Sequence, residues 1–291
     1  MTGVETVERT DGPADTTEHT VGRMVRRERR LVLRDRIAAI LTPLVLLGLW
    51  QVAATSDWID ARLFPAPSLI VANAWDMILD GDLLTHTWAT LSRIIYGSVI
   101  GIVVGVVLGL AMGYYRLLSA AFSPTLSALY ALPKIAIFPL LLVIFGLGET
   151  PRVLVVAISV FFVMQINAMS GVRHVDPRLV EAGTAFGATG WKRFRYVVFP
   201  AALPSVFAGL RVSAGVSILV IVAVEFVGSS DGLGFLIWNA WTLFQPTRMY
   251  VGLAVVAILG AVLAGLVGLG ERWATPWISA GPRRRRRDDA N

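Results

Sequence analysis

Apolar runs close to 20 residues long recur along the whole chain, and they constrain its fold more than any other feature. Five of them are clear, at residues 37–54, 94–114, 152–170, 208–227 and 250–270. A bilayer has a hydrocarbon core about 30 Å thick, so a helix needs about 20 predominantly apolar residues to cross it. The sequence therefore predicts an all-α, polytopic membrane protein.

A sixth apolar segment, residues 122–146, is interrupted by Pro124, Pro133, Lys134 and Pro139. Proline is tolerated in a membrane helix where neighbouring helices or a cavity satisfy the freed backbone groups. We expect this segment to form one broken or tilted span, the third along the chain. The predicted total is then about six transmembrane helices.

The composition agrees with a membrane environment. Hydrophobic residues make up 55% of the chain, charged residues only 16%, and the mean hydropathy is +0.67; soluble domains carry roughly 25% charged residues. The formal charge of +6 would suit a nucleic-acid partner. However, the basic clusters at residues 23–36, at residues 283–287 and around Lys192 lie beside hydrophobic spans. Such clusters are typical of orientation signals, so we expect a lipid bilayer and no nucleic acid.

The distribution of charge predicts three regions and an orientation. Residues 1–36 are expected to be a disordered and then basic tail, residues 37–275 a transmembrane domain, and residues 276–291 a second basic tail. The first apolar run is too long for a cleaved signal peptide and should stay attached. The segments assigned to the inside, together with Arg211 at the inner edge of the fifth span, hold 21 Lys and Arg. The outside loops hold four, which are Arg62, Arg93, Arg152 and Arg248. By the positive-inside rule both termini face the cytoplasm.

Residues that could carry catalysis or metal binding are few. The chain has no cysteine, and its histidines, His19, His86 and His174, are far apart, so each is expected to be a surface or loop residue and no metal site is predicted. Residues 228–232 match the G-x-S-x-G pattern of hydrolases, but they end a membrane helix. Neither Lys134 nor Lys192 follows a glycine, so the chain lacks a Walker A motif. We predict no catalytic residue, and ATP would have to be hydrolysed by another polypeptide.

The second span carries a glycine at every fourth position. These residues are Gly97, Gly101, Gly105, Gly109 and Gly113. Positions without side chains at this spacing form a groove in which another helix can approach closely. The groove predicts tight helix packing, either within one subunit or across a dimer.

The loop between the fourth and fifth spans, residues 171–207, is too patterned to be a simple connector. Asp176 followed by Pro177 is a typical helix start. A short helix over residues 178–186 should be broken by Gly187 and Gly190, and a second helix over residues 191–198 should end before Pro200. Two interpretations stay open at this point, a docking element for a partner protein and an amphipathic helix pair lying on lipid.

This loop resembles the "EAA" motif of binding-protein-dependent ABC importer permeases. The resemblance rests on Glu181-Ala182-Gly183, then Gly187, then residues 197–200, which read VVFP. The spacing of the family is kept, while Gly183, Val197 and Phe199 replace its Ala, Ile and Leu. Residues 63–67, 90–93, 139–146 and 225–234 also resemble the nitrate, sulfonate and taurine branch, so the similarity covers about residues 63–275.

The resemblance implies a function and partners. In such importers the EAA loop forms coupling helices that sit on a separate ATPase, which holds ATP and Mg; this chain itself would need no cofactor. The coupling residues would be Glu181, Ala182, Gly183, Gly187 and Pro200. The resemblance also implies a location in the inner membrane of a bacterial cell, a homodimer and an extracytoplasmic binding protein. The solute would be small and polar, often an oxyanion such as a sulfonate, taurine or nitrate. The alternative from another class is a self-sufficient secondary transporter or channel, for which internal repeats or several intramembrane charges would be expected.

Glu225 is the most informative charged residue within a span, because intramembrane charges are costly. It lies 14 residues beyond Arg211, about 21 Å along one helix, so these two cannot pair. Two interpretations stay open: Glu225 lines a pathway, or it lies at the outer interface and hydrogen-bonds a neighbouring helix. Lys134 is expected to sit in the polar break of the third span.

Overall fold

The computed structural model describes residues 34, 37–39 and 41–279 of the 291, and every regular element in them is a helix. The expected all-α fold is thereby confirmed for the described residues. The predicted N-terminal tail apart from Arg34, the histidine His19 and the arginines at residues 283–287 lie outside them. The chain divides into two compact units, and the boundary along the sequence lies between Ser68 and Leu69.

The first unit contains the predicted first span. A helical stretch covers Ile37–Thr55 apart from residue 40, which is not described, and it is long and apolar enough to cross a membrane. The amide of Gln51 makes two hydrogen bonds to Ser68: its Nε2 donates to the Ser68 hydroxyl and its Oε1 accepts from the Ser68 N–H, both at 3.0 Å. These bonds fasten the end of the following loop to the helix.

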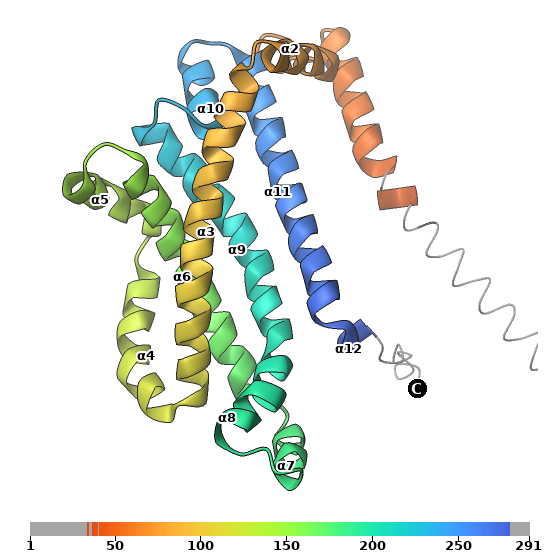
Figure 1. Ribbon diagram of the computed structural model, residues 1–291. Coiled ribbons are helices and arrows are strands. Elements are labelled where there is room, and N and C mark those ends of the chain that lie inside the picture. Colours follow the sequence, from red (N-terminus) through yellow and green to blue (C-terminus); the bar gives the residue numbers. More distant parts are fainter. Residues whose placement is uncertain (1–33, 35–36, 40, 280–291) are drawn as a thin grey trace, which may run out of the picture. The chain divides into compact units, whose positions relative to one another are not determined.

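Four long helices of the second unit correspond to predicted spans. They are α3 (Asp82–Tyr114), α6 (Glu149–Arg173), α9 (Phe199–Gly228) and α11 (Pro246–Ala274) (Figure 1). Each contains its predicted apolar run and continues beyond it. The apolar pattern marks only the part of a helix that lies in hydrocarbon, whereas backbone hydrogen bonding continues into the polar ends.

The third span is broken, as predicted. It consists of α4 (Arg116–Ala131), the 3-10 turn η1 (Lys134–Ile137) and α5 (Phe138–Phe145), with a bend of 89° at the break. Pro133 has no N–H to donate and disfavours the helical conformation of the residue before it. Leu132 accordingly has extended dihedral angles, φ −68° and ψ 136°. If the bent pair counts as one span, the described residues contain up to six.

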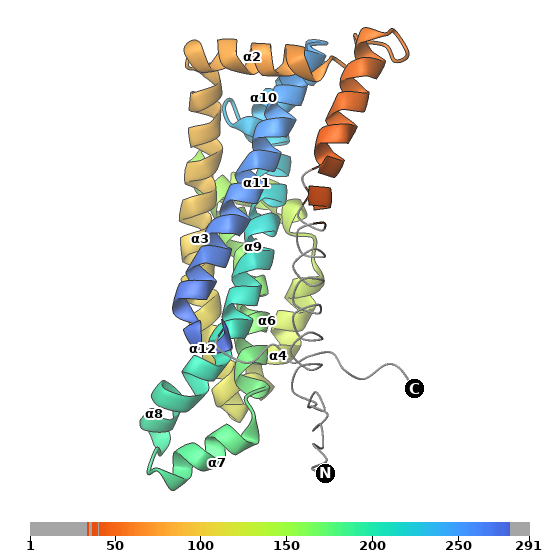
Figure 2. The same cartoon turned by 90° about the vertical axis from the view of Figure 1, so that its right-hand side faces the viewer.

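The shorter helices lie at the two ends of the second unit (Figures 1 and 2). α10 (Leu233–Thr242) and most of α2 (Pro67–Leu79) lie where α3 begins, and neither was predicted. The opposite end carries α7 (Pro177–Ala185) and α8 (Gly190–Arg193). A four-residue helix, α12 (Pro276–Ser279), follows α11.

The core of the second unit is the contact of α6 with α3 on one side and α9 on the other. Fully buried side chains follow α6 at helical spacing, at Val156, Val160, Met164 and Ala168. By contrast, α3 and α11 leave rows of large apolar side chains exposed, including Val103 and Ile258. In a membrane-spanning chain such faces meet lipid or another subunit.

Candidate functional site

The five glycines of the predicted groove all face α6 of the same chain. A Cβ added to Gly97 would lie 2.6 Å from Cβ of Val156, and one added to Gly105 would lie 2.7 Å from the carbonyl oxygen of Phe161. Similar contacts occur at Gly101, Gly109 and Gly113. Real Cβ atoms do not approach so closely, so any side chain here would push α3 and α6 apart. Of the two expected packing partners, the structure shows the one within the subunit.

The patterned loop begins as predicted. The Asp176 carboxylate caps α7 by accepting a hydrogen bond from the Arg178 N–H at 2.9 Å, and Pro177 is the first helical residue. α7 ends at Ala185, and the backbone turns at Gly187 (φ +80°) and Gly190 (φ +51°). This left-handed region favours glycine, because other residues have a Cβ that clashes there.

The second part of the loop differs from the prediction. α8 is followed by a π-helical turn, η2 (Phe194–Val198), which leads directly into α9, so the helix does not end before Pro200. Pro200 is the second residue of α9 and follows the π-helical turn directly, so the proline without an N–H lies where the helical hydrogen-bond pattern already changes. The loop therefore continues into a membrane-spanning helix.

The loop presents exposed apolar side chains at its tip. Phe186 is 92% exposed and Leu179 51% exposed, and Glu181 and Ala182 also lie on the exposed surface of α7. Gly183 faces inward, where its missing side chain leaves room for Val197; an added Cβ would lie 2.7 Å from Cγ2 of that residue. Exposed aromatic and aliphatic groups at a helix–turn–helix tip suit contact with a partner surface.

An ion-pair network lies at the opposite end of the bundle and centres on the buried Arg93, with Glu225 buried beside it and Glu149 and Asp231 partly exposed. Its Nε lies 2.6 Å from Oε2 of Glu149, its Nη1 2.7 Å from Oε1 of Glu225, and its Nη2 binds the Asp231 carboxylate. Glu149 also binds Arg152, 2.6 Å away. We call these five residues the Arg93 cluster. It joins the ends of α3, α6 and α9 to the loop after α9.

Glu225 is fully buried and has several further partners. Its carboxylate accepts hydrogen bonds from the Thr90 hydroxyl at 2.9 Å and from the Gly234 N–H at 2.8 Å. The same hydroxyl accepts a bond from the Leu233 N–H at 2.7 Å. Two donors of the first turn of α10 are thus satisfied by side chains of α3 and α9. Glu225 was expected either to line a pathway or to hydrogen-bond a neighbouring helix. The structure shows it hydrogen-bonded to neighbouring helices, with no exposed surface.

His86 corrects one expectation, because it is a buried residue rather than a surface or loop residue. Its Nδ1 accepts a hydrogen bond from the Gly232 N–H at 3.0 Å. This nitrogen must be unprotonated to accept, so the proton of the neutral ring lies on Nε2, which is 3.4 Å from Oδ1 of Asp82. Gly232 itself has φ +103°. His174, by contrast, is exposed as expected.

Arg93 and Arg152 correct a second expectation, since both were counted among the charges of outside loops. They are 1% and 8% exposed and are neutralised by carboxylates. Burial by itself would raise the pKa of Asp231, but the hydrogen bond and positive charge of Arg93 outweigh that effect and lower the pKa. The resemblance of residues 90–93 and 225–234 to one permease branch was the available signal for this cluster.

Neither end of the bundle has the features of a metal or hydrolase site. Among the described residues no group of three or more His, Asp or Glu could hold a metal ion. In the G-x-S-x-G stretch, the Ser229 hydroxyl donates a hydrogen bond to the Asp231 carbonyl oxygen at 2.6 Å, within its own turn. The serine therefore stabilises the loop that carries Asp231.

An all-α chain with five or six membrane-crossing helices and a helical loop at one end is a multi-pass membrane protein. The chain belongs to the family of binding-protein-dependent transport system inner membrane components, which matches residues 97–276. It is therefore a permease subunit of an ABC transporter, and the EAA loop is characteristic of this family. Such subunits are not catalytic, and the ATPase is a separate chain.

Several curated relatives cover most of the chain. The putative aliphatic sulfonates transport permease protein SsuC of Bacillus subtilis is 31% identical, over 82% of this chain and 86% of that protein. The riboflavin transport system permease protein RibX of Chloroflexus aurantiacus is 39% identical, over 81% and 88%. The taurine transport system permease protein TauC of Escherichia coli is 30% identical, over 84% and 90%.

Solved structures show the same fold. A chain of the MetNI methionine ABC transporter, in an inward facing conformation, superposes with a TM-score of 0.56 at 20% identity. The match covers 65% of this chain and 94% of that one.

Proposed function

We propose that the chain forms, as a homodimer, the membrane path of an ATP-driven importer for a small oxyanion such as a sulfonate. An extracytoplasmic binding protein delivers the solute, and a cytoplasmic ATPase with ATP and Mg drives the cycle through α7 and α8. The observation that carries the proposal is the exposed surface of Leu179, Glu181 and Phe186. α7, which bears the first two, packs through Gly183 against Val197 of η2, and η2 runs into the membrane-spanning α9.

The arrangement of the loop supports coupling in physical terms. Because η2 runs into α9 without a break, a displacement of α7 and α8 by a partner would be transmitted along α9. α9 ends at the Arg93 cluster, at the far end of the bundle (Figure 1). In this proposal the ATPase contacts Glu181 and Ala182, and Gly187 sets the turn that shapes this contact. Gly183 and Pro200 hold the loop against α9.

Two further points belong to the proposal. The positive-inside distribution favours an orientation with both termini and the α7–α8 loop in the cytoplasm. The substrate class follows the sulfonate and taurine relatives. The riboflavin relative, at 39% identity, favours a second candidate, an uncharged heterocyclic solute.

Uptake in proteoliposomes tests the proposal. Purified chain, its ATPase and its binding protein are reconstituted, and entry of labelled taurine, ethanesulfonate and riboflavin is compared with and without ATP. ATP-dependent entry of a sulfonate is expected. Full uptake by the chain alone, driven by an ion gradient, would show a secondary transporter instead, and entry of riboflavin alone would select the second substrate.

The coupling loop is tested with a matched pair of glycine variants. Gly187→Trp places a bulky residue at φ +80° in open space on the loop, and Gly81→Trp does the same at φ +75° at the opposite end of the bundle. The backbone strain is alike in both. We expect Gly187→Trp to lower ATPase association and ATP-driven uptake, and Gly81→Trp to keep both; equal losses would argue against a coupling role.

A further inference from the structure

A cavity of about 290 Å³ lies between α3, α4 and α6, and neither the Arg93 cluster nor the α7–α8 loop contributes to its lining. Its polar side chains are Ser123, Ser127 and Tyr130 of α4 and Gln165 and Arg173 of α6, and the rest of the lining is apolar. All of these helices belong to membrane-spanning segments.

The contribution of α4 is a continuous polar face. Ser119, Ser123 and Ser127 are spaced by four residues and Tyr130 follows by three, so all four lie on one side of the helix. The hydroxyls of Ser119 and Ser123 are hydrogen-bonded to each other at 3.2 Å. Hydroxyl groups on one face of a membrane helix can form hydrogen bonds with protein or water, but they cannot form them with lipid tails.

The facing residue of α6, Gln165, is buried without a proper partner. It is 3% exposed, and its amide nitrogen reaches only the sulfur atoms of Met112 and Met169, at 3.4 and 3.8 Å. Thioether sulfur is a weak acceptor. Within the described part of the chain, no oxygen or nitrogen atom pairs with this amide, although buried polar groups nearly always find such a partner. A molecule in the cavity would supply it.

Arg173 brings a positive charge to the same cavity. Its guanidinium donates a hydrogen bond to the Ser119 hydroxyl, and no carboxylate of the described residues lies within 4 Å of it. It also lines an adjoining cavity of about 290 Å³ on the side of Arg116. Lys134 adds a second cation near the cavity, with its Nζ 4.1 Å above the centre of the Tyr130 ring. No acidic residue lines either space.

From this arrangement we propose that the cavity binds the anionic group of the transported solute, an oxyanion of the sulfonate, carboxylate or phosphonate type. Arg173 presents a fork of N–H donors that matches such a group. The hydroxyls of Ser123 and Ser127 and the amide N–H of Gln165 complete its hydrogen bonds. The inference rests on the proposed function, that a small solute passes through this chain, and it assigns the residues that recognise the charge inside the membrane.

Single-cysteine labelling tests the cavity without requiring transport, because the chain has no native cysteine. Ser127→Cys, in inverted membrane vesicles, is treated with 2-sulfonatoethyl or 2-(trimethylammonium)ethyl methanethiosulfonate, two small reagents of opposite charge. We expect both to reach the thiol and the anionic reagent to react about ten-fold faster, relative to a free thiol, because of the nearby cations. Arg173→Gln should remove most of that preference and Arg173→Lys should retain it.

The matched control is Thr125→Cys, two residues away on α4 and about 200° around the helix. It should stay unlabelled by either charged reagent. Equal rates for the two reagents at Ser127→Cys, or no labelling there, would overturn the proposed anion site. Since the assay uses neither ATP nor the ATPase, that result would leave ATP-driven uptake untouched. Conversely, a charge-selective cavity in a chain without ATP-driven uptake would refute the proposed importer and not the site.

Discussion

Arg93 and Glu225 stand 132 positions apart in the sequence, yet their side chains form a buried ion pair, with Nη1 of the arginine 2.7 Å from Oε1 of the glutamate. The same guanidinium binds Glu149 at the start of α6 and Asp231 in the loop after α9. One side chain therefore joins three membrane helices at a single end of the bundle.

The buried pair should matter for stability far more than an exposed one. Glu225→Gln removes one of the three carboxylates that bind the buried Arg93, and weakening a buried hydrogen-bonded charge in this way costs about 1–3 kcal/mol. Arg93→Gln should cost more, since it leaves three carboxylates without their shared cation. The control is Glu271→Gln, whose partner Arg211 is 57% exposed and whose loss should cost at most about 1 kcal/mol. Thermal unfolding in detergent measures all three, and similar shifts for Glu225→Gln and Glu271→Gln would contradict the prediction.

The glycine groove should tolerate no side chain. Gly105→Leu places carbon atoms against the Phe161 carbonyl and the Met164 side chain, and such overpacking costs about 1–3 kcal/mol or more. Gly265→Leu on α11 is the matched control, because no atom lies within 4 Å of a Cβ added there. We expect a lower unfolding temperature for Gly105→Leu only. An unchanged unfolding temperature for this variant would mean that α3 and α6 do not touch along the groove.

His86 should be required as a hydrogen-bond acceptor. In His86→Phe the ring fills a similar volume, but the buried Gly232 N–H loses its acceptor, at a cost of about 1–3 kcal/mol. The exposed residue His174 offers the control, and His174→Phe should change stability little. Thermal unfolding and protease resistance of the loop around Gly232 report the effect; full stability of His86→Phe would show that this bond contributes nothing.

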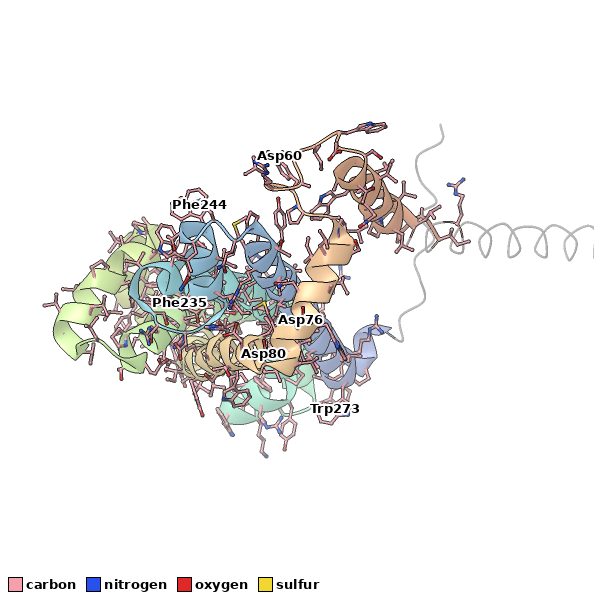
Figure 3. All side chains as sticks on the ribbon, turned by 90° about the horizontal axis from the view of Figure 1, so that it is seen from above. Asp60, Asp76, Asp80, Phe235, Phe244 and Trp273 are labelled. Carbon is pink, nitrogen blue, oxygen red and sulfur yellow. The ribbon has the colours of Figure 1, made fainter. Side chains whose placement is uncertain are left out.

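The proposed orientation predicts which ends of the bundle are labelled from each side of the membrane. Phe244, at the outer edge of the end viewed in Figure 3, is 91% exposed, and Phe186 at the other end is 92% exposed. An impermeant thiol reagent added to spheroplasts should label Phe244→Cys, and Phe186→Cys should be labelled only in inverted vesicles. The reverse pattern would overturn the orientation and, with it, the assignment of α7 and α8 to the cytoplasmic ATPase.

Much of the fold could be predicted because it depends on local properties. The apolar runs locate the spans, Asp176 and Pro177 start a helix through their own backbone groups, and Pro133 breaks the third span by lacking an N–H. Resemblance over the EAA loop predicted the family. The error at Pro200 arose because a proline does not always end a helix: Pro204 lies inside α9, and the π-helical turn before Pro200 carries the helix past it.

The sequence by itself determined that this chain crosses the membrane, about how often, and which family its loop belongs to, since length, hydropathy and motif spacing are properties of single segments. The tertiary structure alone decided which charges are buried. Arg93 carries the same side chain as the arginines of the tails, and only the convergence of α3, α6 and α9 supplies its carboxylates. Arg152 pairs within α6, with Glu149 three residues earlier, but its burial also depends on the neighbouring helices. Gly232, which bonds to His86, and Ser119, which bonds to Arg173, likewise lie far away in the sequence. Burial and pairing depend on atoms that are distant in sequence, so no pattern within one segment can contain them.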